Sequence, residues 1–341
     1  MKPEIYFAEK LISGGTTKEN VSIVVEGDRI IDIVKKKLPS KTSGIITPAF
    51  IDAHSHIALH RAGEPGIEEE VNDKSDSILP LLDPLDSAYF DDPALKESVD
   101  FGVLYSCIVP GSANLIGGRS RIIRNFAQDR STALFADHGF KAALGFNIRK
   151  PDWKGVRANT RMGAYRILEQ KLESIIAKRE KSSLNNAKKQ AELADKAAAG
   201  KLSEEAYERD AAFLETEQTL EWTSEEKALL SIAEGKKPLK VHVHKADDVM
   251  YLIDLCRRFP LQVSAEHLMD VDREDIFRAL RTENIPAVYG PLGCHPYKTE
   301  LRHATWKNAS AIMKSGMTFG LMTDHPVTLS QTLRESLKYF L

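Results

Sequence analysis

Two histidines separated by one residue close an apolar run near the start of this 341-residue chain, where residues 48–56 read PAFIDAHSH. In an extended strand alternate side chains share a face, so His54 and His56 point the same way. Two imidazoles on one face at the end of a strand can chelate a single metal ion. The spacing therefore predicts a metal site here, rather than a structural role for both side chains.

Three later apolar runs end in the same kinds of residue. The first reads VHVH and places His242 and His244 on one face, the second ends at His267, and the last ends at Asp324. Imidazole and carboxylate are the ligands that a catalytic Zn²⁺, Fe²⁺ or Mn²⁺ site uses when a water molecule must stay bound.

These side chains need a scaffold that brings distant strand ends together. From residue 45 onward apolar strand-like runs alternate with amphipathic helical segments, a pattern typical of parallel strands in an open α/β sheet or a closed barrel. Seven runs are clear: 45–53, 102–110, 140–146, 239–244, 261–266, 285–290 and 318–323. An eighth, within residues 116–126, is short and charged. In a closed barrel the carboxyl ends of all strands converge on one face, where the histidines and Asp324 would meet.

Two segments fall outside that alternation. Residues 1–44 contain β-rich runs at 21–25 and 29–34, joined by a turn at Gly27, which predicts a hairpin of a small sheet. Of the 60 residues in 178–237, 24 are charged, with alanines and leucines at helical spacing. We expect a solvated helical insertion of two helices broken at Gly200, and a lid over the site is the alternative.

Composition excludes several classes of protein. Lysine and arginine total 47 against 49 acidic residues, for a formal net charge of −2, so no basic surface for nucleic acid is indicated. No apolar stretch is long enough to span a membrane. The N-terminus lacks the features of a signal peptide and the three cysteines form no paired framework, so a cytoplasmic protein is expected.

Taken together, these motifs resemble the amidohydrolase superfamily, and specifically its imidazolonepropionase-related branch. The strand-1 signature of the family is PGFIDxHxH, here with Ala49 in place of the usual glycine. Residues 110–118 (PGSANLIGG), 160–163 (TRMG), 241–248 (VHVHKADD) and 323–327 (TDHPV) also match in the right order. The resemblance implies a (β/α)₈ TIM-like barrel over residues 45–341 and a small β-sandwich domain, of which residues 1–44 form the N-terminal part.

The resemblance also assigns roles to single residues. His54, His56, His242, His267 and Asp324 are the implied metal ligands, with His242 preferred to His244 at strand 5. Asp324 is also the general base, and His267 either binds a second metal ion or polarises the scissile carbonyl. Arg161, Asn114 and His295 are the expected substrate contacts. The implied cofactor is one divalent ion, Zn²⁺ with Fe²⁺ or Mn²⁺ as alternatives.

Two features depart from the family pattern. Binuclear members bridge their ions with a carbamylated lysine or a glutamate at the end of strand 4, where this chain has Phe146. Lys141 lies five residues earlier, about 16 Å along an extended strand, which is too far to bridge. The chain also ends 17 residues after Asp324, so the returning strands of the β-sandwich are expected to be missing. Exposed strand edges invite pairing with another copy of the chain.

The leading hypothesis is a metal-dependent hydrolase of a non-peptide C–N bond in a cyclic amide or related small molecule. A metal ion lowers the pKa of its bound water to near 7, which would yield hydroxide for attack while Asp324 moves the proton. With Phe146 at the bridging position, one ion is expected. A deaminase of the same superfamily and a catalytically degenerate ligand-binding scaffold remain the alternatives.

Overall fold

The computed structural model describes residues 2–40, 44–61, 63, 65–294, 296 and 298–341. The chain forms two compact units, residues 1–50 and 51–341. Within the described residues, none of the helices combines the length and the hydrophobicity that crossing a membrane requires.

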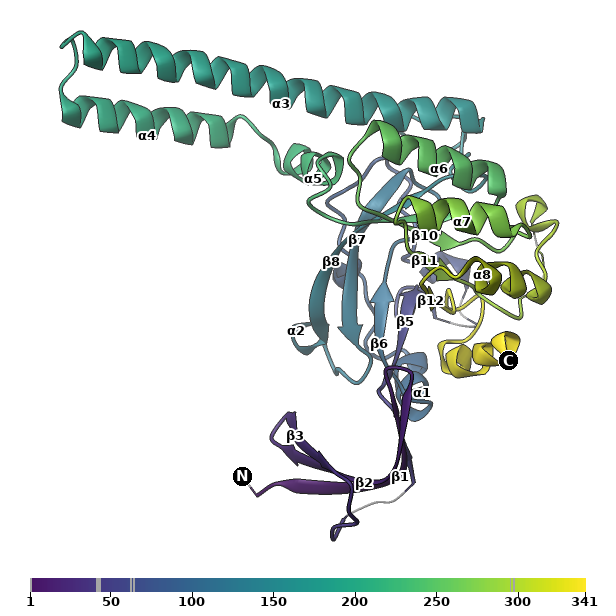
Figure 1. Cartoon of the computed structure of the whole chain (residues 1–341). Helices are drawn as coiled ribbons and strands as arrows, with labels where there is room; N and C mark the ends of the chain where they lie inside the picture. The colour runs from purple at the N-terminus through teal and green to yellow at the C-terminus, as the bar shows by residue number, and fades with distance from the viewer. Residues whose placement is uncertain (1, 41–43, 62, 64, 295, 297) are drawn as a thin grey trace. The chain divides into compact units, whose positions relative to one another are not determined.

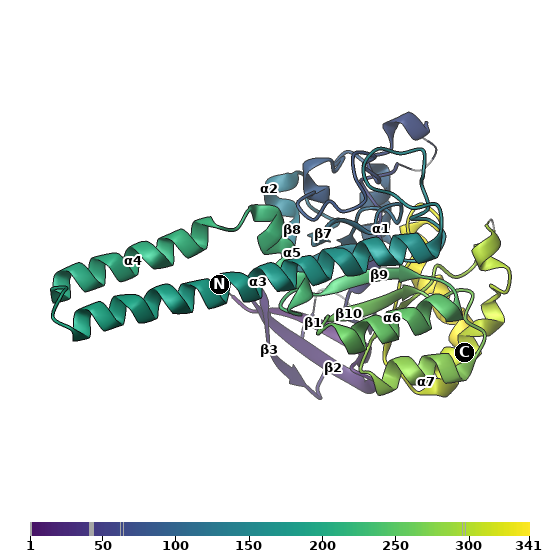
Figure 2. The same cartoon turned by 90° about the horizontal axis from the view of Figure 1, so that it is seen from above.

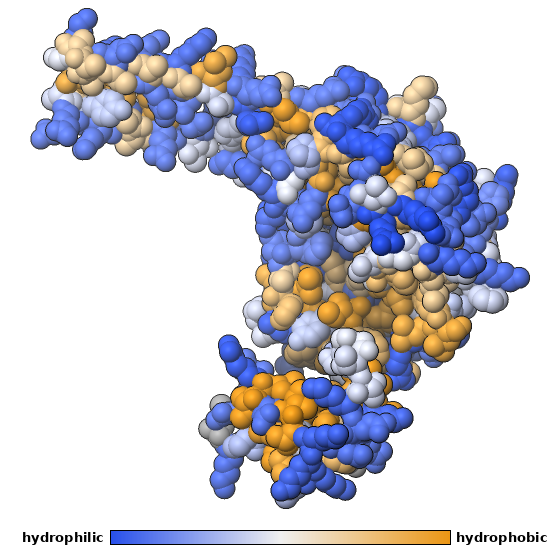
Figure 3. Space-filling view, viewed as in Figure 1, coloured by the Kyte–Doolittle hydropathy of each residue, from blue (hydrophilic) through white to orange (hydrophobic). Residues whose placement is uncertain are grey.

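The first unit is a four-stranded sheet in the order β3-β2-β1-β4 (Figure 1). Its strands are β1 (Glu4–Ser13), β2 (Thr16–Glu26), β3 (Arg29–Val34) and β4 (Ile45–Ile46). The predicted hairpin is present, because β2 and β3 pair antiparallel around a turn in which Gly27 has a φ of 62°. Apolar side chains gather on this unit (Figure 3), and three isoleucines of β3, Ile30, Ile31 and Ile33, are exposed.

The second unit is built around an eight-stranded sheet in the order β12-β11-β10-β9-β8-β7-β6-β5. The strands are β5 (Phe50–Ser55), β6 (Val103–Ile108), β7 (Ile116–Arg124), β8 (Leu134–Ala143), β9 (Leu239–Val243), β10 (Val263–His267), β11 (Ala287–Tyr289) and β12 (Phe319–Leu321). Backbone hydrogen bonds from Asp324 N to His54 O (3.1 Å) and from His56 N to His325 O (3.1 Å) join the last segment to β5. The sheet therefore curls into a nearly closed barrel, which confirms the predicted fold.

The expectation that all strands of the barrel run parallel is wrong. β8 to β12 run parallel, but β7 pairs antiparallel with both β6 and β8. Only residues 109–115 separate β6 from β7, and a parallel crossover needs about a dozen residues or more. The short connection therefore forces the chain to turn back on itself.

The helices are α1 (Pro93–Asp100), α2 (Arg130–Ala133), α3 (Arg161–Ala198), α4 (Glu204–Leu220), α5 (Ser224–Ala233), α6 (Ala246–Arg258), α7 (Glu274–Thr282) and α8 (Ala309–Ser315). Short 3₁₀ segments lie at Gly66–Glu68, Pro84–Asp86, Thr299–Leu301, Trp306–Asn308 and Ser330–Phe340. In Figure 1, α6, α7 and α8 lie side by side outside the parallel strands. Their apolar faces join those strands in the main hydrophobic core.

The helical insertion is larger than the predicted 178–237. Its first helix, α3, already begins at Arg161, where the side chain of Thr160 caps the N-terminus by accepting a hydrogen bond from Gly163 N (3.1 Å). α3 ends just before Gly200, whose φ of 68° suits the break expected there. Figures 1 and 2 show α3 and α4 side by side, extending beyond the barrel strands as an arm.

Candidate metal centre

His54 and His56 stand at the end of β5, and each has one ring nitrogen anchored. His54 Nδ1 lies 2.9 Å from Glu266 Oε2, and His56 Nδ1 donates to the carbonyl of Val109 (2.7 Å). The other nitrogens, both Nε2, lie 3.5 and 3.1 Å from Asp324 Oδ1. A hydrogen bond to the far nitrogen fixes the orientation and tautomer of an imidazole that ligates metal, so this arrangement suits two ligands facing one carboxylate.

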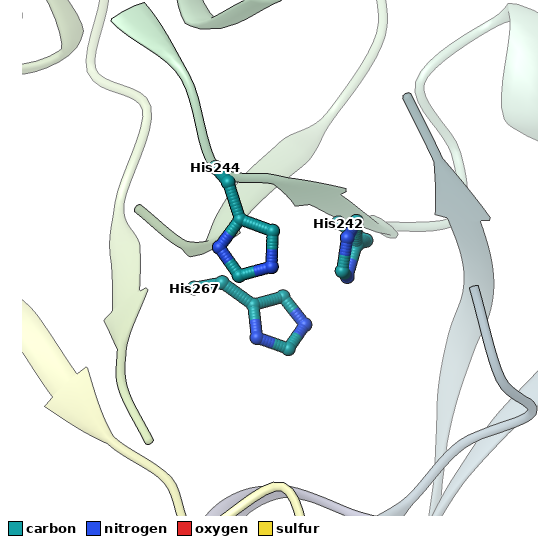
Figure 4. A group of neighbouring side chains, drawn as sticks. All are labelled: His242, His244 and His267. Carbon is teal, nitrogen blue, oxygen red and sulfur yellow. The ribbon is translucent and has the colours of Figure 1, made fainter. Parts of the chain in front are cut away.

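A second group consists of His242, His244 and His267, whose side chains point toward one another (Figure 4). The centroid of the His242 ring lies 4.6 Å from that of His244 and 4.2 Å from that of His267. His242 and His244 share one face of the β9 end, as the alternation of side chains requires, and His267 ends the neighbouring β10. His242 and His244 are thus not alternatives, because the structure brings both into the cluster.

Asp324 connects the two groups. Its Oδ1 faces His54 and His56, while its Oδ2 lies 3.8 Å from His267 Nδ1. Burial alone would raise the pKa of Asp324, but the hydrogen bond from His56 and the nearby cations outweigh burial and lower it. The carboxylate is therefore ionised at neutral pH.

Several buried ring nitrogens of the two groups lack hydrogen-bond partners among the described residues. Among the described residues no partner is found for His54 Nε2, His242 Nδ1, His244 Nδ1 or either ring nitrogen of His267. Burial lowers the pKa of all four histidines, and neighbouring positive charges lower it further, so the rings are neutral at pH 7. A buried polar atom without a partner is costly, and a neutral imidazole nitrogen is a good ligand for a divalent transition metal.

In each of two groups, one ligand atom per residue lies within 4.8 Å of the others: His54, His56 and Asp324, and His242, His244 and His267. The ligand atoms of both groups are of the types, and lie close enough together, to bind a metal ion. The five residues expected as ligands from the sequence all belong to this pair of groups, and His244 is an addition to that set.

A buried polar layer supports β5 and the segment that carries Asp324. Asp52 is fully buried and accepts hydrogen bonds from the backbone N–H (3.1 Å) and hydroxyl of Thr323 and from the hydroxyl of Ser330 (3.3 Å). Burial raises the pKa of Asp52 to about 6, although these hydrogen bonds oppose the shift. Asp52 thus ties the strand of His54 to the residue before Asp324.

Lys141 lies closer to the site than the sequence indicated. β8 ends at Ala143, not near residue 146, so Lys141 is only two residues from the strand end and pairs in register with Lys240. Burial lowers the pKa of Lys141 to about 7, and its charge acts on His54 and Asp324. The expectation that Lys141 is about 16 Å below the site is therefore wrong.

Phe146 does not fill the bridging position with an apolar ring. Its side chain is 44% exposed and lies under the Arg149 guanidinium. Its backbone N–H instead donates to Oε2 of buried Glu300 (2.8 Å), whose Oε1 lies 3.7 Å from His242 Nε2 and 3.8 Å from His244 Nε2. A second buried carboxylate therefore borders the three-histidine group, paired with Lys298 at 2.8 Å.

The three expected substrate contacts have different surroundings. Arg161 is the first residue of α3, and its Nη1 lies 2.5 Å from Oδ1 of buried Asp248, which raises the pKa of the guanidinium. Asn114 is buried; its amide donates to Asp73 O (3.0 Å) and accepts from Arg157 (3.0 Å). His295 lies outside the described residues. The structure thus engages Asn114 in loop packing and places Arg161 beside the helix that follows His244.

Sequence reasoning missed the polar residues that border His242. Asn147 Nδ2 donates to Ser112 Oγ (2.7 Å) and lies 3.4 Å from His242 Nε2, and Lys298 Nζ donates to Asn147 Oδ1 (3.3 Å). Asn147, Lys298 and Glu300 come from loops after β8 and β11, and no motif marks them. Only their position after predicted strand ends could have suggested them.

Comparison with known proteins agrees with this architecture. No family model matches the chain. An amidohydrolase from Thermotoga maritima MSB8 has a similar structure, with a TM-score of 0.71 and 24% sequence identity over 95% of this chain and 80% of that one. The chain has an amidohydrolase fold. Amidohydrolase tasK from Hapsidospora irregularis is 34% identical over 117 residues, which are 34% of this chain but only 11% of that protein's length.

These similarities support the fold and do not indicate one branch of the amidohydrolases. Neither the Thermotoga structure nor tasK is named as an imidazolonepropionase. Within the amidohydrolase fold, the histidines and Asp324 lie where the strands of the barrel end, which is where barrel enzymes place their chemistry.

Proposed function

We propose that this chain is a metal-dependent amidohydrolase that hydrolyses a non-peptide C–N bond in a cyclic amide or related small molecule. The observation that carries the proposal is a set of buried ring nitrogens around the ionised Asp324, on His54, His242, His244 and His267, that have no hydrogen-bond partner among the described residues. A scaffold without chemistry has no reason to keep so many costly groups at one strand end. The amidohydrolase fold and the similarity to tasK support hydrolysis of C–N bonds.

The proposed cofactor is one divalent ion, Zn²⁺ or else Fe²⁺ or Mn²⁺. His54, His56 and Asp324 would hold it, because this group contains an anionic ligand facing two anchored imidazoles. When bound, such an ion polarises a carbonyl and makes water acidic enough to lose a proton at neutral pH. His242, His244 and His267 contribute no negative charge, and Glu300 beside them is already paired with Lys298.

Asp324 is the proposed group that moves the proton. Its carboxylate is ionised and its two oxygens face opposite groups, His56 on one side and His267 on the other. As general base it takes a proton from the attacking water, and as general acid it returns that proton to the departing nitrogen. One carboxylate within reach of both atoms suffices for both steps.

His267 orients the substrate in this proposal. It is neutral and buried, and both of its ring nitrogens lack partners among the described residues, so one N–H can donate to the carbonyl oxygen as charge develops there. Arg161 and Lys298 supply positive charge to the same end of the barrel, each already balanced by a carboxylate. A small molecule with a hydrogen-bonding or weakly acidic group suits this balance better than a strongly anionic one.

The test is a panel of lactams, cyclic ureides and N-acyl amino acids, with mass spectrometry of the products. We expect turnover that disappears with a chelator and returns with Zn²⁺, and a loss of about 10²–10⁴-fold in kcat for Asp324→Asn. Asp91→Asn, which changes an exposed aspartate, is the matched control and should leave turnover unchanged.

The alternatives give different products. Release of ammonia from a C–NH₂ carbon without ring opening would identify a deaminase. Metal binding without turnover of any member of the panel would favour the ligand-binding scaffold.

A further inference from the structure

Few residues of the arm formed by α3 and α4 are buried. None of the 17 residues of α4, all of them described, is buried, and after Ser182 the only buried residue of α3 is Leu193. Fixing one residue costs roughly 1–2 kcal/mol of conformational entropy, and most of the stability of a helix in a protein comes from the packing of one of its faces. The arm as seen in one chain therefore lacks the burial that would keep it ordered.

Large apolar side chains nonetheless stand on its surface. Phe213 is 64% exposed and Leu220 is 78% exposed, and in Figure 3 apolar side chains interrupt the hydrophilic surface of the arm. The two residues are seven apart on α4, so they share one face of the helix. Both line a groove of about 900 Å³ between α4 and α3.

The groove carries opposite charges along its two sides. Its α3 side includes Lys188 and Lys189, and its α4 side includes Glu217 and Glu221. The same asymmetry holds for the whole arm. Residues 178–198 of α3 contain six basic and three acidic residues, whereas α4 contains six acidic residues and one basic residue.

Within one arm only some of these charged side chains form ion pairs or hydrogen bonds. Lys189 pairs with Glu217 at 2.8 Å, and Ser182 donates to Glu221 (2.6 Å), while Lys188 forms no ion pair with any of the described residues. A surface with one basic and one acidic helix is complementary to a second copy of itself when α3 of one copy lies over α4 of the other. The opposite arrangement, α3 over α3, would set basic rows against each other.

We propose that this groove is a self-association surface, and that its occupant is the arm of a second copy of this chain. In a two-fold dimer each Phe213 and Leu220 enters the groove of the partner and loses its contact with water, and the basic α3 of each copy faces the acidic α4 of the other. This interface lies outside the proposed metal centre and does not depend on it.

The test is sedimentation velocity of the full chain over a range of micromolar concentrations. We expect a dimer for the wild type and at least about tenfold weaker self-association for Phe213→Glu and for Leu220→Glu, as is typical when a buried apolar anchor is lost. Phe126→Glu is the matched control, because Phe126 is 51% exposed but lies beyond β7, and its dimer should persist. A wild type that stays monomeric, or arm variants that dimerise like the wild type, would overturn the proposal.

A photo-crosslinking residue at position 213 gives an answer even if a charged variant unfolds the arm. The expected product joins two chains through the arms, with peptides from residues 182–198 of the partner. A crosslink to the barrel of the same chain, or to a different protein with no chain-to-chain product, contradicts the proposal. Charge-reversal variants test the facing of α3 and α4 separately. Lys188→Glu and Glu217→Lys should each weaken the dimer, and an equimolar mixture should form heterodimers more tightly than either variant pairs with itself.

Discussion

The proposed metal centre and the α3–α4 arm differ in the kind of side chain that each one buries. At the proposed metal centre, polar and ionisable side chains such as Asp52, Lys141 and Glu266 are fully buried, which works against stability. In the arm, apolar side chains such as Phe213 and Leu220 are exposed. Each region departs from the usual rule that apolar groups are inside and polar groups outside. Each departure supports one of the two proposals, a bound metal ion at the first region and a second copy of the chain at the other.

The largest expected effect comes from cutting the buried network under the site. Asp52→Ala leaves the hydroxyls of Thr323 and Ser330 and a backbone N–H without their acceptor, so the free energy of unfolding should fall by about 3 kcal/mol or more. Metal content should fall as well, because Asp324 follows Thr323 directly. Chemical denaturation and metal analysis measure both effects.

Ser330→Ala is the control for that variant, since it removes only one of the donors and should cost about 1 kcal/mol. Equal losses for the two variants would show that Asp52 does not organise the network.

Acid should destabilise the metal-free protein through the buried histidines of the proposed metal centre. The pKa values of His54, His242, His244 and His267 lie below their usual 6.5 in the folded chain. The unfolded chain therefore binds more protons below pH 6.5, so the metal-free protein loses stability as the pH falls, by up to about 1.4 kcal/mol per pH unit for each histidine.

Asp52 opposes this trend, because its pKa is raised from 3.8 to about 6 in the folded chain. Between pH 3.8 and pH 6 the folded chain therefore binds more protons at this carboxyl than the unfolded chain does. The stability lost through the four histidines exceeds the stability gained through this one carboxyl. Thermal unfolding of chelated protein between pH 7.5 and about 5 should show the decline, and His244→Asn should flatten it.

Removing the arm should have the smallest effect on the site. Deleting residues 182–217 and joining the ends with a short flexible linker removes most of the exposed arm and one buried leucine. Metal content per chain should stay the same, while self-association should disappear. Loss of soluble protein would instead show that the arm contributes to the core of the barrel.

Most of the candidate metal ligands could be predicted because a short sequence pattern marks each of them. His54 and His56, the VHVH run, His267 and Asp324 each close an apolar strand, and strand ends of a barrel meet on one face. Lys141 was misplaced because β8 ends three residues earlier than its apolar pattern suggests. The chain leaves the strand at Ala143, and Gly145 follows with a φ of 84°.

Other features depend on contacts that no local pattern records. Glu300 reaches His242 and His244 from a loop more than fifty residues away, and the backbone of Phe146 holds it there. The direction of β7 follows from the length of its connection, a geometric limit that hydrophobic alternation does not show. The start of α3 at Arg161 follows from its Thr160 cap, which the charge count beginning at Lys178 does not detect.

Metal content tests the proposed metal centre most directly. The full chain, purified without chelator and supplied with Zn²⁺, Fe²⁺ or Mn²⁺, is analysed by mass spectrometry beside His54→Ala, His56→Ala and the His303→Ala control. We expect one tightly bound divalent ion per chain, lost in the first two variants and kept in the control. Two ions per chain would contradict the single-ion proposal, and no stoichiometric ion under any of these conditions would contradict the metal centre itself.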